Sequence, residues 1–199
     1  EQDALNNFEL AQRILTENNN PLISAIQLRG LSNILLIKSK FDNAIQLLLQ
    51  HINEYQEINN EKEEMLLLFL CLSIVYAKTK KNNESREIIE KVIGAAQRTK
   101  NNNINSKGYY FLGTTYRWEN SFDKALEYYK IALSYAHNGL DKRTEFSILF
   151  DSGYSYGYQG DTSNALKHYR KAWKISRDCF LHNHLNTPVL FNNLTAIYE

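Results

Sequence analysis

The segment "CFLHNH" holds residue types that bind metal ions, because Cys179, His182 and His184 lie within six residues. A structural zinc site needs such side chains on a common face, with further ligands at a supporting spacing. Two histidines two residues apart at a helix end point to different faces, and no carboxylate or thiol recurs at a supporting spacing. We therefore expect no metal site and no cofactor.

Residues that could do covalent chemistry are present without the patterns that activate them. The chain has no glycine-rich phosphate loop and no paired carboxylates at a catalytic spacing. Cys71 stands inside "FLCLSIVY", where a cysteine acts as a small apolar core residue. The two cysteines show neither metal nor disulfide spacing, which favours a reducing, cytoplasmic compartment. We expect that the chain is not an enzyme.

The charges of the chain almost cancel, with 23 basic against 22 acidic side chains. This balance argues against a general nucleic-acid or membrane-surface binder. No signal peptide is recognisable, and no apolar run approaches the ~20 residues of a membrane span. A basic run could bind phosphate or an acidic partner, but we expect it to be a solvated convex face. Its residues are Lys167, Arg170, Lys171, Lys174 and Arg177.

The elements that must carry these residues are helices, because the chain has two prolines, eight glycines and no useful β alternation. A pattern of a small residue, a large apolar residue four later and a small residue three later recurs at intervals of 40, 41, 40 and 40. Its copies are Ala4/Phe8/Ala11, Ala44/Leu48/His51, Ser85/Ile89/Val92, Ala125/Tyr129/Ala132 and Ala165/Tyr169/Ala172.

Another small residue stands twelve positions before each of the last four copies: Ser32, Ser73, Gly113 and Gly153. Two antiparallel helices joined by a short turn approach closely only where side chains are small. We therefore expect the Gly or Ser of a first helix to meet the Ala of a second helix at their crossing.

These patterns resemble the tetratricopeptide repeat in its longer variety of about forty residues. The likeness is strongest in residues 107–132 and 146–172, although the family's proline is missing and its first-helix tryptophan is replaced by Leu, Phe or Tyr. The resemblance implies an all-α, right-handed α-solenoid of stacked antiparallel helix hairpins, whose first helices line a concave groove.

On this reading the chain is a single solenoid, residues 1–199. Residues 1–18 would be the second helix of a preceding repeat, and 187–199 the first helix of a following one. The repeats between them are 21–58, 63–100, 104–138 and 142–182. Unpaired end helices would expose apolar faces, so we expect a segment of a longer protein and possible self-association through the terminal helices.

Groove positions follow from the helical register of the first helices. They are Arg29, Asn33, Leu70, Ile74, Lys78, Tyr110, Thr114, Arg117, Phe150, Tyr154, Tyr158 and Asn192. Aromatic anchors with a few directed polar groups suit a peptide or a partner helix. We expect a peptide or protein partner, with no nucleic acid contacted directly and no membrane.

Some tetratricopeptide domains grip the C-terminal carboxylate of a peptide with a set of five basic and amide residues. By resemblance, Arg29, Asn33 and Lys107 match three of these. Cys71 and Phe111 replace the other two. The alternative is that Arg29 and Lys107 are simply solvated.

Two functions therefore compete. The first is a non-catalytic binding module within a larger regulatory or signalling protein, which captures a peptide or helix in the groove. The second is a structural scaffold or self-assembly array that uses the repeat ends or the convex face. Forty-residue copies resemble those of bacterial peptide-sensing regulators and of animal scaffolds, and the Asn, Lys and Ile content leans towards a bacterial source.

Overall fold

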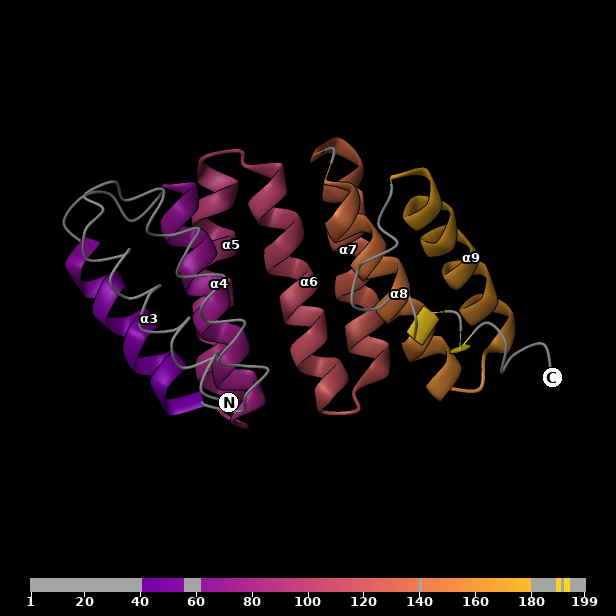
Figure 1. Cartoon of the computed structure of the whole chain (residues 1–199), viewed down its shortest axis with the longest axis horizontal. Coiled ribbons are helices and arrows are strands. Elements are labelled where there is room, and N and C mark those ends of the chain that lie inside the picture. Colours follow the sequence, from indigo (N-terminus) through magenta and orange to yellow (C-terminus); the bar gives the residue numbers. More distant parts are fainter. Residues whose placement is uncertain (1–40, 56–61, 140, 180–188, 191, 194–199) are drawn as a thin grey trace, which may run out of the picture. The chain divides into compact units, whose positions relative to one another are not determined.

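The computed structural model describes residues 41–55, 62–139, 141–179, 189–190 and 192–193, and over these it contains helices and no strands (Figure 1). The chain divides into two compact units, Glu1–Ala95 and Ala96–Glu199. The helices are α3 (Phe41–Tyr55), α4 (Glu63–Lys78), α5 (Asn82–Arg98), α6 (Asn102–Trp118), α7 (Phe122–Gly139), α8 (Lys142–Tyr158) and α9 (Thr162–Asp178). The expected all-α helical-repeat fold is confirmed. The segments 1–18 and 21–40 lie outside the described residues, as does most of 187–199.

The turns inside the hairpins share one geometry. At the end of α6, Ser121 N donates to Tyr116 O at 2.9 Å and Asn120 N donates to Arg117 O at 3.0 Å. This pair of bonds is the Schellman motif, which places the residue after the helix in the left-handed region. In the three hairpins the φ of this residue is 64° at Lys80, 59° at Asn120 and 79° at Gly160. A repeated turn geometry gives each hairpin the same sharp reversal.

Asparagine and aspartate side chains begin three of the helices. Asn101 Oδ1 accepts from Ile104 N at 3.0 Å at the start of α6. Asp141 caps α8 through Thr144 N at 3.1 Å, and Asp161 caps α9 in the same way at 3.0 Å. Each cap satisfies a backbone donor that has no partner within its helix. The polar spacers of the sequence therefore fix where these helices start.

The crossing of first and second helices differs in detail from the sequence expectation. A Cβ added to Gly113 would lie 2.7 Å from two ring carbons of Tyr129 and 3.0 Å from the carbonyl oxygen of Ala125. At Gly153, the three nearest atoms all belong to the ring of Tyr169. The glycine therefore makes room chiefly for a tyrosine ring, and the alanine side chain is not its main neighbour.

Apolar side chains fill the space within each unit. In Glu1–Ala95, a cluster that includes Leu48 of α3 and Leu68 and Val75 of α4 is joined by Ile88 of α5. In Ala96–Glu199, α7 packs against both α6 and α8, and Ile148 of α8 joins the alanines and tyrosine of α7. None of the helices in the described parts of the chain has the length and apolar composition that a bilayer crossing needs.

Candidate functional site

A buried carboxylate lies between the two first helices of the unit Ala96–Glu199. Asp151 on α8 is only 5% exposed, and its Oδ2 accepts a 2.9 Å hydrogen bond from the hydroxyl of Tyr110 on α6. Its other oxygen, Oδ1, lies 3.8 Å from Nη2 of Arg117, two turns further along α6. The carboxylate therefore connects two turns of α6 to α8, which contact each other directly.

Arg117 is held on two sides by α8. Its guanidinium carbon lies 5.1 Å from the ring centroid of Tyr154, which is within cation–π range, and Asp151 faces one of its terminal nitrogens. The Nε atom of Arg117 is buried and has no hydrogen-bond partner. A buried N–H without an acceptor is unfavourable, so the packing around Arg117 leaves this donor unsatisfied.

Burial and charge act on the pKa values of this group in opposite directions. Burial raises the pKa of Asp151 above its ordinary value, and the Arg117 charge and the Tyr110 hydrogen bond offset only part of that rise. Burial lowers the pKa of Arg117, but Asp151 together with Tyr129 and Tyr110 outweighs burial, and the net shift of the pKa is upward. Burial also raises the pKa of the Tyr110 phenol well above its usual range. The face therefore offers a permanent cation beside a neutral hydroxyl.

Aromatic rings continue from this group to the surface. The rings of Tyr154 and Tyr158 lie 4.6 Å apart between centroids, and the ring of Phe122 lies 5.4 Å beyond Tyr158. Tyr158 is 64% exposed, and Trp118, in the last turn of α6, is 36% exposed. We call the surface formed by Tyr110, Arg117, Asp151, Tyr154 and Tyr158 the α6/α8 face.

Other predicted groove residues lie beneath this face. Thr114 is buried, and its hydroxyl lies 3.3 Å from the hydroxyl of Tyr129. Phe150 is buried with its ring 5.9 Å from that of Tyr169. Burial raises the pKa of Tyr169 to about 12, and its hydroxyl accepts a 3.0 Å bond from Asn193 Nδ2. These side chains support the face and offer little surface of their own.

The remaining predicted groove residues lie in the other unit, near the end of the described residues or outside them. In the unit Glu1–Ala95, Leu70 of α4 is buried, Ile74 is half-buried and Lys78 is exposed. Asn192 is exposed, near the end of the described residues. Arg29 and Asn33 lie outside the described residues. The groove assignment of all of these positions stays a prediction.

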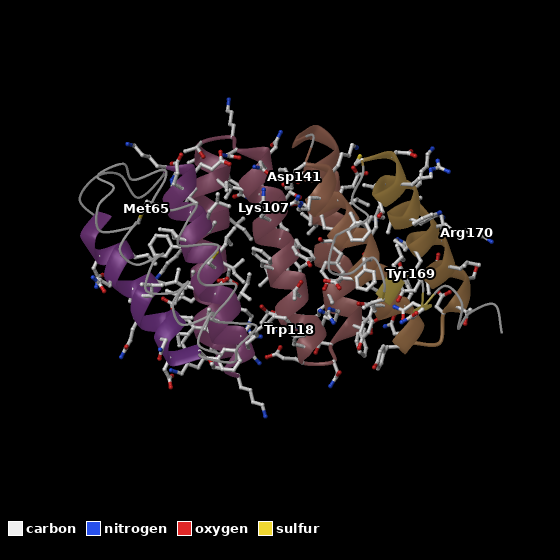
Figure 2. The ribbon with its side chains drawn as sticks, viewed as in Figure 1. Met65, Lys107, Trp118, Asp141, Tyr169 and Arg170 are labelled. Carbon is white, nitrogen blue, oxygen red and sulfur yellow. The ribbon has the colours of Figure 1, made fainter. Side chains whose placement is uncertain are left out.

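Lys107 is bonded to two other side chains of this chain. Its Nζ lies 2.6 Å from Asp141 Oδ2 and 2.5 Å from Asn103 Oδ1, and its side chain is 18% exposed (Figure 2). Lys107 thus ties α6 to the residue that caps α8. This contact favours a structural role over the grip on a peptide carboxylate that the resemblance suggests.

Metal binding finds no support in the part of the chain that the structure describes. Within it, no group of three or more His, Cys, Asp or Glu side chains could hold an ion. Cys71 is a buried free thiol and Cys179 a half-buried one. His182 and His184 lie outside the described residues.

Asp151 was missed by the sequence reasoning. It follows Phe150 directly in "ILFDSGYSYGY", where the other residues are apolar, small or aromatic. A single acid inside such a helix, 34 residues after Arg117, is the signal that could have identified it. Its partner lies on another hairpin, so the spacing within α8 does not reveal the pair.

Comparisons with known proteins agree with the fold. Residues 146–179 match the family model of the tetratricopeptide repeat. A sequence search of curated proteins finds no match. Among solved structures, BtubC (BKLC) from P. vanneervenii has a TM-score of 0.73 at 18% identity, over 99% of this chain and 81% of that one.

Two further similar structures are complexes with other molecules. A Rap protein complexed with competence and sporulation factor has a TM-score of 0.76 at 13% identity, over 96% of this chain and 56% of that one. Bacillus thuringiensis PlcR, in complex with the peptide PapR7 and DNA, has a TM-score of 0.78 at 13% identity, over 96% and 69%. At these identities the likeness establishes the fold.

Proposed function

We propose that this chain, whose helical-repeat fold is similar to that of tetratricopeptide-repeat proteins, binds a peptide or a partner helix along the α6/α8 face. One observation carries the proposal. The exposed ring of Tyr158 packs against the ring of Tyr154, which in turn lies over the guanidinium of Arg117 that Asp151 faces. An aromatic anchor beside a directed polar group is typical of residues that dominate binding energy.

The face is organised before any partner arrives. Tyr110 and Asp151 bond each other across the helices, and the buried Thr114 and Phe150 lie below them. A binding surface whose side chains are already ordered loses less conformational entropy on association. A peptide can stack an apolar side chain on Tyr158 and place a carbonyl or carboxylate oxygen beside Arg117.

We infer a non-catalytic role, because the polar groups of the face bond to one another. Asp151 accepts from Tyr110 and faces Arg117, so its oxygens already have protein partners. A general base needs a free position beside the proton that it removes. A cytoplasmic location goes with this proposal, since Cys71 and Cys179 are free thiols.

The comparisons support a signal-binding role within a regulator. Two of the similar structures, by their descriptions, hold a signalling factor or a peptide. This chain covers 56% and 69% of those two proteins, so we propose that it supplies the ligand-binding part of a larger regulatory protein.

The test is selection of a random-peptide display library on the full chain, followed by fluorescence anisotropy with the enriched peptides. We expect Tyr154→Ala/Tyr158→Ala to weaken binding by about tenfold or more, the loss expected for a central aromatic anchor. The matched control is Tyr128→Ala/Tyr135→Ala, which removes two half-buried tyrosines from the second helix α7. Circular dichroism should show similar helical content in all variants.

Two results would contradict the proposal. Equal weakening by both tyrosine pairs would place binding outside the α6/α8 face. Loss of self-association in sedimentation, with peptide binding unchanged, would favour the alternative of a scaffold or self-assembly array.

A further inference from the structure

The outward side of α9 carries five cations in one stripe. The buried positions of α9 are Ala165, Tyr169, Ala172 and Ser176, which face the core. The stripe lies between them at spacings of three and four residues, so its members are neighbours on the helix surface. All five are exposed, and we call them the basic face of α9: Lys167, Arg170, Lys171, Lys174 and Arg177.

This charge is concentrated in one helix. The five cations and a single acid, Asp178, give α9 a formal charge of +4, although the whole chain carries only +1. At the C-terminal end of the stripe, Arg177 Nε forms an ion pair with Asp178 Oδ1 at 2.9 Å. The near-neutral composition of the chain therefore conceals a strongly positive surface.

The repeats within the chain provide an internal comparison. The positions of α7 that are equivalent to Lys167, Arg170, Lys171 and Lys174 are exposed too. They are occupied by four different kinds of residue: an acid, a cation, an apolar residue and a small residue. They are Glu127, Lys130, Ile131 and Ser134 on α7, and Glu87, Glu90, Lys91 and Gly94 on α5. The repeat fold therefore does not require cations there.

The stripe is unfavourable for α9 by itself. Like charges three and four residues apart repel each other on a helix. Their field reaches the half-buried His168, whose pKa is lowered first by burial and then by the charges of Lys171 and Lys167. An array of carboxylates placed over the stripe would remove this repulsion.

We propose that the basic face of α9 docks an acidic protein segment, rich in Asp and Glu. Charge complementarity carries this choice, because exposed lysines and arginines attract carboxylates and steer their approach. The half-buried indole of Trp173, between Arg170 and Arg177 in the sequence, packs against the core and adds apolar area at the edge of the stripe. Arg170 extends outward from α9 (Figure 2). This surface is on a second helix and shares no residue with the α6/α8 face.

The test uses the full chain and fluorescein-labelled poly-L-glutamate, with binding followed by fluorescence anisotropy at two salt concentrations. We expect Arg170→Gln/Lys171→Gln to weaken binding by about fivefold, because two exposed ion pairs are lost. The control, Lys91→Gln/Lys130→Gln, removes the same charge from equivalent exposed positions on α5 and α7 and should change binding by less than about twofold.

A supporting result is this difference between the two pairs, together with weaker binding of the unaltered chain at higher salt. The proposal fails if both pairs weaken binding equally, since the attraction would then depend only on net charge. It also fails if poly-L-glutamate does not bind. A duplex DNA or phosphatidylserine vesicles that bind more tightly through Arg170 and Lys171 would assign the surface to a different class of partner.

Discussion

The ring of Tyr129 on α7 occupies the space into which a side chain at Gly113 on α6 would extend. A Cβ at Gly113 would lie 2.7 Å from Cδ1 and Cε1 of that ring, which is 1% exposed. Gly153 and Tyr169 show the same relationship one repeat later. Glycine at this position is therefore coupled to the tyrosine sixteen residues further on.

Replacing Gly113 with alanine should destabilise the chain. The buried ring cannot move freely, and overpacking of this kind costs about 1–3 kcal/mol. Alanine recovers part of that through its higher helix propensity, about 1 kcal/mol. We expect a lower urea midpoint for Gly113→Ala. Gly157→Ala is the control, because its Cβ would meet only Ala165 Cβ at 4.0 Å, and it should gain about 0.5–1 kcal/mol. If the urea midpoints of both variants shifted in the same direction, the proposed overpacking at Gly113 would be wrong.

Asp141→Ala should destabilise the chain at neutral pH by about 1–2 kcal/mol, because it removes the cap of α8. Burial alone would raise the pKa of Asp141, but hydrogen bonds from Lys107 and Thr144 outweigh it and hold the pKa below its ordinary value. The ionised group is therefore stabilising above about pH 4, and this advantage is lost as the pH falls further. Urea unfolding at a series of pH values measures this loss of stability.

Lys107→Met is the matched control for this experiment, since it removes the ion pair and leaves the cap on Thr144. Its effect should be smaller than that of Asp141→Ala. If the difference between the unaltered chain and Asp141→Ala grew as the pH fell below about 4, the lowered pKa would be wrong.

Asp151→Asn should show the opposite pH dependence. The pKa of Asp151 is raised, chiefly by burial, so the folded chain holds this proton more tightly than the unfolded chain does. As the pH rises from about 4 through the folded pKa, the unaltered chain should lose stability relative to Asp151→Asn. Asparagine keeps an oxygen that accepts from Tyr110. The same pH series measures this change, and an increase in relative stability with pH would show that the Arg117 pair outweighs burial.

The pKa of His168 should rise when the nearby cations are removed. Burial, followed by Lys171 and Lys167, lowers this pKa, while the backbone oxygen of Asn164 and the charge of Asp161 oppose the shift. In Lys167→Gln/Lys171→Gln we expect the pKa to move upward yet stay below the ordinary value, because burial persists. NMR titration of the imidazole protons measures it.

The lowered pKa of His168 decides how the stability of the folded chain changes with pH. The unfolded chain binds the His168 proton more readily, so folding weakens as the pH falls below about 6.5, and the double variant should weaken less. Poly-L-glutamate bound on the basic face of α9 should also raise this pKa. An unchanged pKa in the double variant would show that burial alone sets it.

Periodicity in the sequence was enough to predict the fold class. Small residues at a fixed spacing, such as Gly113 and Ala125, mark where paired helices approach, and the structure confirms helical repeats. The spacing did not reveal which side chain fills the gap. That is decided by the rotamer of Tyr129, which turns its ring towards Gly113.

The site was less predictable than the fold. Helical register placed Tyr110, Arg117 and Tyr154 on one predicted surface, and the structure brings them together around Asp151. Register alone treated Thr114 and Phe150 as surface groups, whereas the structure buries both. Burial depends on how neighbouring hairpins stack, and this information is absent from a single helix.

The sequence by itself determined that this chain forms repeated helix pairs, because the need to bury apolar faces at close crossings dictates the residue types at regular intervals. Only the tertiary structure decided that Arg117 and Asp151 would meet and that the ring of Tyr129 would fill the space beside Gly113. Side chains on separate helices interact at distances of a few ångströms, and only packing sets those distances.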